Sequence, residues 1–167
     1  MCIRDSIYCD LLLDSVVHII TAMVRRELVH DLGGFDTTLR TGEDYDFWLR
    51  AARRSRIDQL DHVLAWYRIH PGSITQAPHG ESGEYRVLQA ALSRHGPADG
   101  HGRTVPVDVL QRRLAAICFG HGYLHFWRGS ALQARRAFGR CLHHLAWQPR
   151  AIVYWVLSAF RSFWVKA

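Results

Sequence analysis

Two acidic residues, Glu43 and Asp44, stand where a helix is expected to begin, and that position suits acid–base chemistry. Thr41 precedes Asp44 by three residues, in the place of an N-cap. The helix dipole and the free amides of a first turn keep a carboxylate ionised, so it can accept a proton from a hydroxyl near neutral pH. Acidic residues in a first turn also serve helix stability alone. Position by itself therefore leaves a catalytic and a structural role open.

Histidines offer a second kind of chemistry. His70 ends a predicted strand, and the hydroxyls of Ser73 and Thr75 follow it. An imidazole beside such donors could bind a divalent metal or a phosphate. His121 and His125 are four residues apart on a predicted helix, a spacing that can chelate zinc, but no acidic or cysteine ligand accompanies them. With 11 histidines in the chain, chance explains that pair more readily than a metal site.

The elements that would position these groups alternate between strands and helices. Residues 18–24, with the sequence HIITAMV, are rich in β-branched side chains and predict a buried strand. Two short strands are predicted at residues 57–60 and 63–69. Helices are predicted at residues 25–31, which the Gly33-Gly34 pair ends, at 41–54 and at 81–95.

A Gly- and Pro-rich joint at residues 96–106 predicts a boundary between a domain of residues 1–96 and a helical extension of residues 97–167. One long amphipathic helix follows up to Gly129, a second begins at Ser130 with a capping-box pattern, and a third has Pro149 in its first turn. Residues 114–149 resemble one tetratricopeptide-like helical pair, although two helices that simply close the core are the plainer interpretation. The apolar last helix could lie in a membrane interface or be buried, and we favour burial.

Composition narrows the class of protein. The chain has 167 residues, 49% of them hydrophobic, which excludes a disordered chain. Its net charge of +6 comes from dispersed arginines, which suggests attraction to anions without selecting one. The four cysteines show no metal-ligand spacing, and we expect reduced thiols in a cytoplasmic protein. No apolar run is long enough to span a bilayer, so any membrane contact would be peripheral, at the inner face of the cell membrane.

Three blocks of sequence, taken together, resemble the second half of a family 2 glycosyltransferase catalytic domain. The blocks are RREL at residues 25–28 with GGFD at 33–36, GEDYDFWLR at 42–50, and YRIHPGS at 67–73. They occur in the family's order, within a region of about residues 10–76. The resemblance implies a fold class of α/β, a partial GT-A (Rossmann-like) half-domain, followed by the helical hairpin or bundle.

The resemblance also implies roles for individual residues. Asp44 matches the catalytic base, which deprotonates an acceptor hydroxyl for an inverting attack on a nucleotide-activated sugar. Glu43 and Trp48 match the lining of the acceptor pocket, and Gly34 would let the backbone approach the substrate closely. His70 matches a ligand of the divalent metal, Mn²⁺ or Mg²⁺. Two further residues would contact the diphosphate of the donor, namely Arg68 and Ser73.

The resemblance leaves part of the family's machinery unmatched. Its donor-binding half carries a DxD motif, and the one DxD string here, at residues 44–46, belongs to the Glu-Asp block. We therefore expect this chain to be a fragment of a longer transferase, inactive alone, that uses a nucleotide-sugar donor and a saccharide or lipid-linked acceptor, as in envelope polysaccharide biosynthesis. The alternative is a non-catalytic helical protein-interaction module with a remnant α/β piece. No nucleic-acid-binding motif is recognisable, so we expect no nucleic acid partner.

Overall fold

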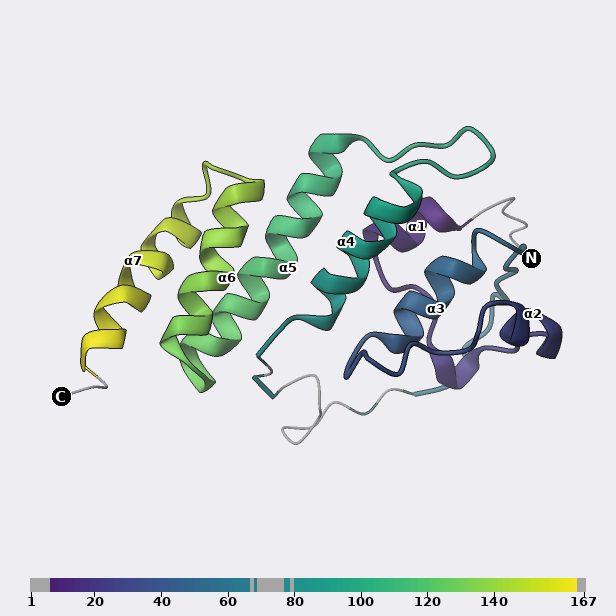
Figure 1. Cartoon of the computed structure of the whole chain (residues 1–167), viewed down its shortest axis with the longest axis horizontal. Coiled ribbons are helices and arrows are strands. Elements are labelled where there is room, and N and C mark those ends of the chain that lie inside the picture. Colours follow the sequence, from purple (N-terminus) through teal and green to yellow (C-terminus); the bar gives the residue numbers. More distant parts are fainter. Residues whose placement is uncertain (1–6, 67, 69–76, 79, 165–167) are drawn as a thin grey trace. The chain divides into compact units, whose positions relative to one another are not determined.

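The computed structural model describes residues 7–66, 68, 77–78 and 80–164. The chain divides into two compact units, the first made of residues 1–68 and 86–107 and the second of residues 69–85 and 108–167. The predicted division at residue 96 stays a prediction, and the two units are described separately below. Figure 1 shows the course of the chain.

The first unit is built on α1 (Tyr8–Leu13), α3 (Glu43–Ala51) and the greater part of α4 (Gly83–His95), with α2 (Arg26–Asp31) at its surface. Its core contains the apolar side chains of these helices. The hydroxyl of Tyr8 donates to the carbonyl of Gly96 at 3.0 Å, and the hydroxyl of Tyr45 donates to the carbonyl of Leu11. Both tyrosines therefore tie α1 to other elements while their rings fill the core. The buried apolar side chains include Leu11, Leu12, Phe47, Leu49, Val87 and Leu88.

The prediction of a partial GT-A (Rossmann-like) α/β half-domain is wrong. Helices make up the regular structure of the described residues, which form no sheet: Ala98 and Thr104 form an isolated antiparallel bridge, and Gln59 is also a bridge residue. A β-strand needs a neighbouring strand to receive its backbone hydrogen bonds, and two or more partners to be stable in water. Within the described ranges the extended segments build no ladder of this kind.

The segments predicted as strands show this directly. Residues 18–24 contain a 3₁₀ turn, η1 (Ile19–Thr21), with extended backbone on either side, and they are not buried: Ile20 is 68% exposed and Met23 fully exposed. Residues 57–66 are extended or irregular, and Val63 and Trp66 are 79% and 92% exposed. β-Branched composition therefore correctly indicates extended backbone here, but it does not supply the partner that would bury it. Tyr67 and residue 69 of the last predicted strand lie outside the described residues.

The helix predictions are confirmed to within a few residues, whereas neither of the two predicted side-chain N-caps makes a capping hydrogen bond. The Gly33-Gly34 pair ends α2, because both glycines have φ +72° and their amides donate to the carbonyls of His30 and Val29. Helix α3 begins at Glu43 with Gly42, at φ +83°, as its N-cap, so Thr41 is not the cap. Ser130 is the N-cap of α6 (Ala131–His144), yet its side chain makes no capping hydrogen bond.

The second unit contains α5 (Val107–Arg128), α6 and α7 (Pro149–Trp164), which lie side by side in Figure 1. Aromatic rings hold them together. The ring of Tyr154 on α7 lies 5.1 Å from that of Phe126, 6.1 Å from that of Phe119 and 5.6 Å from that of Phe138, measured between centroids. Helix α5 approaches α6 closely at Gly122, where a Cβ atom would lie 2.9 Å from the Phe138 ring. Three helices that are consecutive in sequence therefore share one aromatic core.

Helix α7 has two different faces. Its inner face is packed, because Ala151 and Ser158 are fully buried and the indole of Trp155 lies against α6 at Gly139. Its outer face leaves apolar side chains exposed (Val153, Val156, Leu157 and Phe160). Burial, the expectation from sequence, therefore describes half of this helix. None of the helices in the described ranges is both long and apolar enough to cross a membrane.

Candidate functional site

Helix α3 carries the acidic pair of the sequence analysis and places its two aspartates in different surroundings. Asp46 faces inward and is 6% exposed, whereas Asp44, two residues earlier, is half-buried. Residues two apart on a helix point about 200° apart around the axis, so one of them can join the core while the other faces outward. The two carboxylates therefore need separate explanations.

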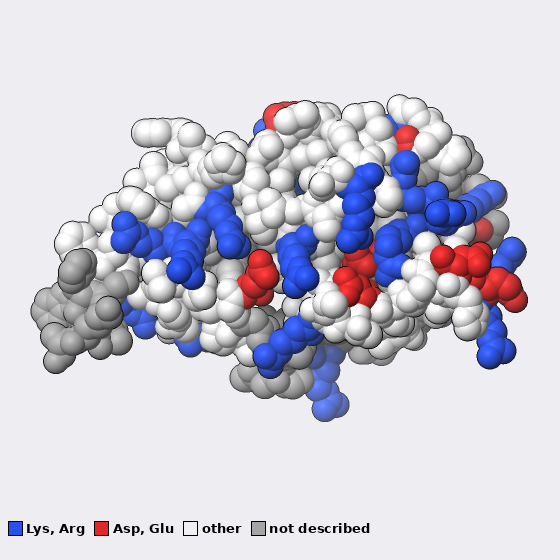
Figure 2. Space-filling model, in the orientation of Figure 1, with Lys and Arg blue, Asp and Glu red and all other residues white. Residues whose placement is uncertain are grey.

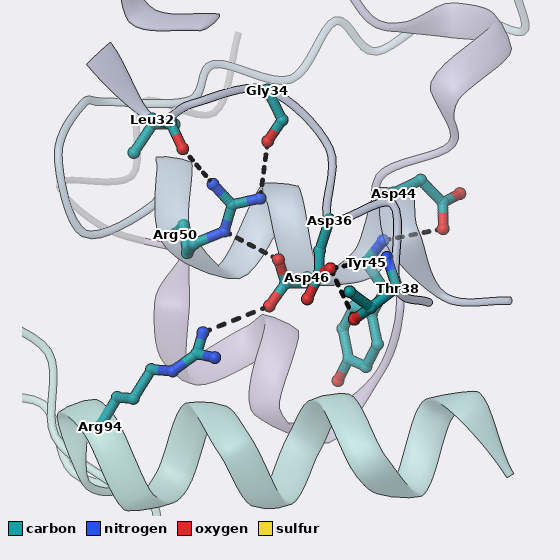
Figure 3. A network of polar contacts seen from close by, with 9 residues as sticks. All are labelled: Leu32, Gly34, Asp36, Thr38, Asp44, Tyr45, Asp46, Arg50 and Arg94. Atoms are coloured by element: carbon teal, nitrogen blue, oxygen red, sulfur yellow. Dashed lines mark hydrogen bonds and ion pairs between the residues drawn. The ribbon is translucent and has the colours of Figure 1, made fainter. Parts of the chain in front are cut away.

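Asp46 is the centre of an ionic network (Figure 3). Its Oδ2 accepts a hydrogen bond from Nε of Arg50 at 2.8 Å, and its Oδ1 lies 3.6 Å from Nη1 of Arg94 on α4. The guanidinium of Arg50 also donates to the carbonyls of Leu32 and Gly34, at 2.7 and 2.8 Å. One carboxylate thus joins α3 to α4 and, through Arg50, to the glycine turn after α2. Its role is structural.

Asp44 lies outside this network. Its Oδ1 accepts a hydrogen bond from the backbone amide of Tyr45 at 2.7 Å, and no residue of the described part of the chain forms an ion pair with it. Figure 3 shows its carboxylate pointing away from Arg50 and Arg94. A first-turn carboxylate that no arginine neutralises keeps lone pairs available for a proton, and the role of Asp44 as a base stays a prediction.

The other predicted site residues that the structure describes differ in burial and in contacts. Glu43 is half-buried beside Asp44, and Arg68 is exposed. Trp48 is 4% exposed, packs edge-on against Phe47 at 4.9 Å between ring centroids, and its Nε1 finds no hydrogen-bond partner among the described residues. Gly34 has a positive φ and open space where a Cβ would lie, but its carbonyl accepts from Arg50, and its close approach to substrate stays a prediction. Stacking of Trp48 on a sugar would need its ring to be uncovered, and its role stays a prediction.

The predicted metal site is not tested. His70 and Ser73 lie outside the described residues, so the convergence of Asp44 and His70 stays a prediction. Among the residues that the structure does describe, no group of three or more His, Cys, Asp and Glu side chains could hold a metal ion. This includes the neighbourhood of His121 and His125, whose rings lie 4.6 Å apart.

A large concave region of about 1220 Å³ lies in the first unit. It is bordered by the extended segments at residues 16–25 and 55–65, with Asp10 and Trp48 among its lining residues. A smaller one of about 230 Å³ lies beside the ionic network, with Asp36, Arg50 and Arg94 in its wall. Asp44 lines neither of them. The acceptor pocket that the resemblance implies is therefore not outlined by these two regions.

Nucleophilic cysteine chemistry is disfavoured by burial. Cys9, Cys118 and Cys141 are buried free thiols, as expected from sequence. Burial raises the pKa of Cys118 to about 12 and that of Cys141 to about 11, and it also raises the pKa of Cys9. A thiol is a good nucleophile only as the thiolate, so these three are unreactive near neutral pH.

Sequence reasoning missed the ionic network, although part of its signal is visible. Asp46 and Arg50 are four residues apart, the spacing at which opposite charges meet on a helix. That spacing does not say that the pair is buried or that Arg50 reaches the glycine turn. Arg94 lies 48 positions further along the chain, and nothing in the sequence links it to Asp46.

Comparison with known proteins gives one relationship. No known family model matches the chain, and no solved structure matches it. A Rickettsia typhi protein named an uncharacterized glycosyltransferase is 33% identical over 78 residues. These residues are 46% of this chain and 24% of that protein. The chain thus covers about a quarter of the length of this relative and is related to a protein named as a glycosyltransferase.

Proposed function

We propose, from the relationship to the Rickettsia protein and the geometry of α3, that this chain is part of a family 2-like glycosyltransferase. The reaction transfers a sugar from a nucleotide-sugar donor to a hydroxyl of a saccharide or lipid-linked acceptor, with inversion at the anomeric carbon. Asp44 is the base, and Glu43 and Trp48 border the acceptor. Polysaccharide synthesis at the cytoplasmic side of the cell membrane is the biological setting that fits such a reaction.

The observation that carries the proposal is the difference between the surroundings of Asp44 and those of Asp46. Both belong to the block at residues 42–50, yet Asp46 is neutralised by Arg50 and Arg94 while the carboxylate of Asp44 faces away from both. A general base must keep a lone pair available for the incoming proton, and arginines bound to a carboxylate occupy its lone pairs. Both oxygens of Asp46 face arginines, whereas the carboxylate of Asp44 lies outside any ion pair among the described residues.

The proposed step follows from these positions. Asp44 takes the proton of the acceptor hydroxyl as the hydroxyl oxygen forms a bond to the anomeric carbon of the donor. The bond from that carbon to the phosphate oxygen breaks, and the electron pair leaves with the nucleoside diphosphate. General-base assistance of this kind contributes about 10²–10⁴ in rate. The proposal also includes a divalent cation, Mn²⁺ or Mg²⁺, with His70 as a ligand, Arg68 and Ser73 near the donor diphosphate, and Gly34 close to substrate.

The test is nucleoside diphosphate release by the protein encoded in the full reading frame, over a panel of nucleotide sugars with saccharide and lipid-linked acceptors. Asp44→Asn should lower kcat by about 10²–10⁴ with the thermal midpoint unchanged. Asp108→Asn is the matched control, because Asp108 is also a first-turn aspartate, on α5, and is exposed. It should leave turnover unchanged.

Each result decides something. Full turnover by Asp44→Asn would remove Asp44 from the mechanism while keeping a transferase. No release with any donor and acceptor pair, with or without Mn²⁺ and Mg²⁺, would contradict the transferase and favour the non-catalytic interaction module. Loss of turnover with a chelator, restored by either metal, would support the cation.

A further inference from the structure

The helices α5, α6 and α7 of the second unit have a charge distribution that differs sharply from the rest of the chain, although Glu84 of the same unit pairs with Arg113. All 15 acidic residues lie at or before Asp108, so the helices α5, α6 and α7 carry no acidic residue beyond the first turn of α5. On the face seen in Figure 2, the part over α6 and α7 shows basic and uncharged side chains. The basic residues after Asp108 are Arg112, Arg113, Arg128, Arg135, Arg136, Arg140, Arg150, Arg161 and Lys166.

An apolar surface lies within this basic region, on the outer face of α7. We call it the outer stripe, and it consists of Val153, Val156, Leu157 and Phe160, between 40% and 61% exposed. Their spacing of three and four residues places them in one row along the helix. Because the inner face of α7 is packed on α6 through Ala151, Trp155 and Ser158, the outer stripe is not needed to hold the unit together.

Arginines flank the outer stripe in fixed positions. The guanidinium of Arg150 lies 5.7 Å from the Phe119 ring centroid, and that of Arg161 lies 5.4 Å from the centroid of Phe126. Both arginines lie on one side of the outer stripe, by the helical period. On the other side of α7, the guanidinium of Arg135 lies 4.9 Å from the ring of Trp155. Trp147, 80% exposed, precedes the helix.

We infer that the outer stripe of α7 docks on an anionic lipid surface, with the helix lying in the plane of the interface. Aliphatic and aromatic side chains gain free energy by entering the acyl boundary, and flanking arginines gain from anionic headgroups. An exposed tryptophan at the helix start suits the headgroup level. The inference rests on the second unit alone and does not depend on the transferase proposal.

Charge argues against two other partners for the outer stripe, a second copy of the chain and a nucleic acid. A second copy docked through the same face would bring α6 and α7, which carry no acidic residue, against their own basic residues, and this costs electrostatic free energy. A nucleic acid would satisfy the arginines but would leave the outer stripe without an apolar phase to enter. An anionic bilayer is complementary to both features at once.

The experiment is flotation of the 167-residue chain with vesicles of phosphatidylcholine, alone or with about 30% phosphatidylglycerol, at low and high salt. The chain should float with the anionic vesicles and much less with neutral ones. The double variant Leu157→Ser/Phe160→Ser should weaken binding at least about tenfold, since several buried CH₂ groups are lost. Arg150→Gln and Arg161→Gln should each weaken it roughly fivefold, and high salt should act in the same direction.

The matched control is Leu132→Ser, because Leu132 is an exposed leucine on α6, outside the outer stripe. It should bind like the wild type, and circular dichroism should show all variants folded. Equal flotation of Leu157→Ser/Phe160→Ser and wild type would overturn the inference. Two other results would also overturn it. One is a dimer that the double variant abolishes while the chain binds no vesicles, and the other is retention of the chain on DNA without flotation.

Discussion

The two units use different physical means to hold their helices. In the first, polar groups make long-range ties: the network of Asp46, Arg50 and Arg94 connects α3, α4 and the glycine turn, and the tyrosine hydroxyls reach carbonyls of other segments. In the second, aromatic rings around Tyr154 fill the space between consecutive helices. The extended segments of the first unit take no part in these ties and are exposed, whereas the rings bury the inner faces of the helices in the second.

This contrast also separates the candidate functions. The first unit contains Asp44, the proposed base, whose carboxylate is not paired with an arginine among the described residues. The second contains a row of apolar side chains among arginines, the proposed docking surface. The two proposals thus concern different compact units, and each can be tested without changing the residues of the other.

The strongest way to test the aromatic side of the comparison is Phe138→Ala. Phe138 is fully buried and lies 5.5 Å from Phe119 and 5.6 Å from Tyr154, between ring centroids. Truncation should lower the free energy of unfolding by about 3–5 kcal/mol, because a ring-sized cavity is left. Denaturant unfolding followed by circular dichroism measures this. A loss below about 1 kcal/mol would mean that the rings do not hold the second unit.

The ionic side is tested by Asp46→Asn. We expect a loss of about 2–3 kcal/mol in the free energy of unfolding, less than for a fully buried pair, because Arg50 is 19% exposed and keeps two carbonyl acceptors. Exposed Asp58→Asn, which breaks a surface pair with Arg56, is the control and should cost less than about 1 kcal/mol. Equal effects of the two variants would show that the network contributes no more than a surface ion pair.

The smallest effect concerns pH. Burial and the neighbouring His143 lower the pKa of His144, which contacts Gln111 Oε1 through Nδ1 at 2.7 Å and the Tyr85 hydroxyl through Nε2 at 2.8 Å. Because Oε1 only accepts, Nδ1 donates to it and Nε2 accepts from Tyr85, an arrangement of the neutral ring.

The sign of the pH effect follows. With a folded pKa below the ordinary 6.5, the contribution is present above pH 6.5 and is lost as pH falls from there through the lower folded pKa, because the unfolded chain binds the proton more readily. Thermal melts between pH 8 and pH 5 should show a falling midpoint, and His144→Gln should reduce the slope. The slope that remains in His144→Gln should come from His95 in the first unit, because burial lowers the pKa of His95 as well. An unchanged slope in His144→Gln would contradict this assignment.

The sequence predicts the second unit well and the first only in part, for a physical reason. Helices α5, α6 and α7 are recognisable from local period and end signals, and each packs on its neighbour in the chain, so Ala134 and Phe138, one turn apart on α6, are both buried. In the first unit, residues 18–24 have a strand-like composition, but a strand forms only beside a neighbouring strand, and composition does not identify that neighbour. The same limit hides the link between Asp46 and Arg94, which lie on different helices. The block around Asp44 could be predicted; its separation from the arginines could not.

The buried thiols give the two units independent reporters. Cys9 belongs to the first unit, and Cys118 and Cys141 belong to the second. Since each is shielded in the native state, a thiol-directed reagent modifies it chiefly when its surroundings open. Mass spectrometry of the modified peptides would therefore resolve, in one sample, which half of the molecule loosens first under heat or denaturant.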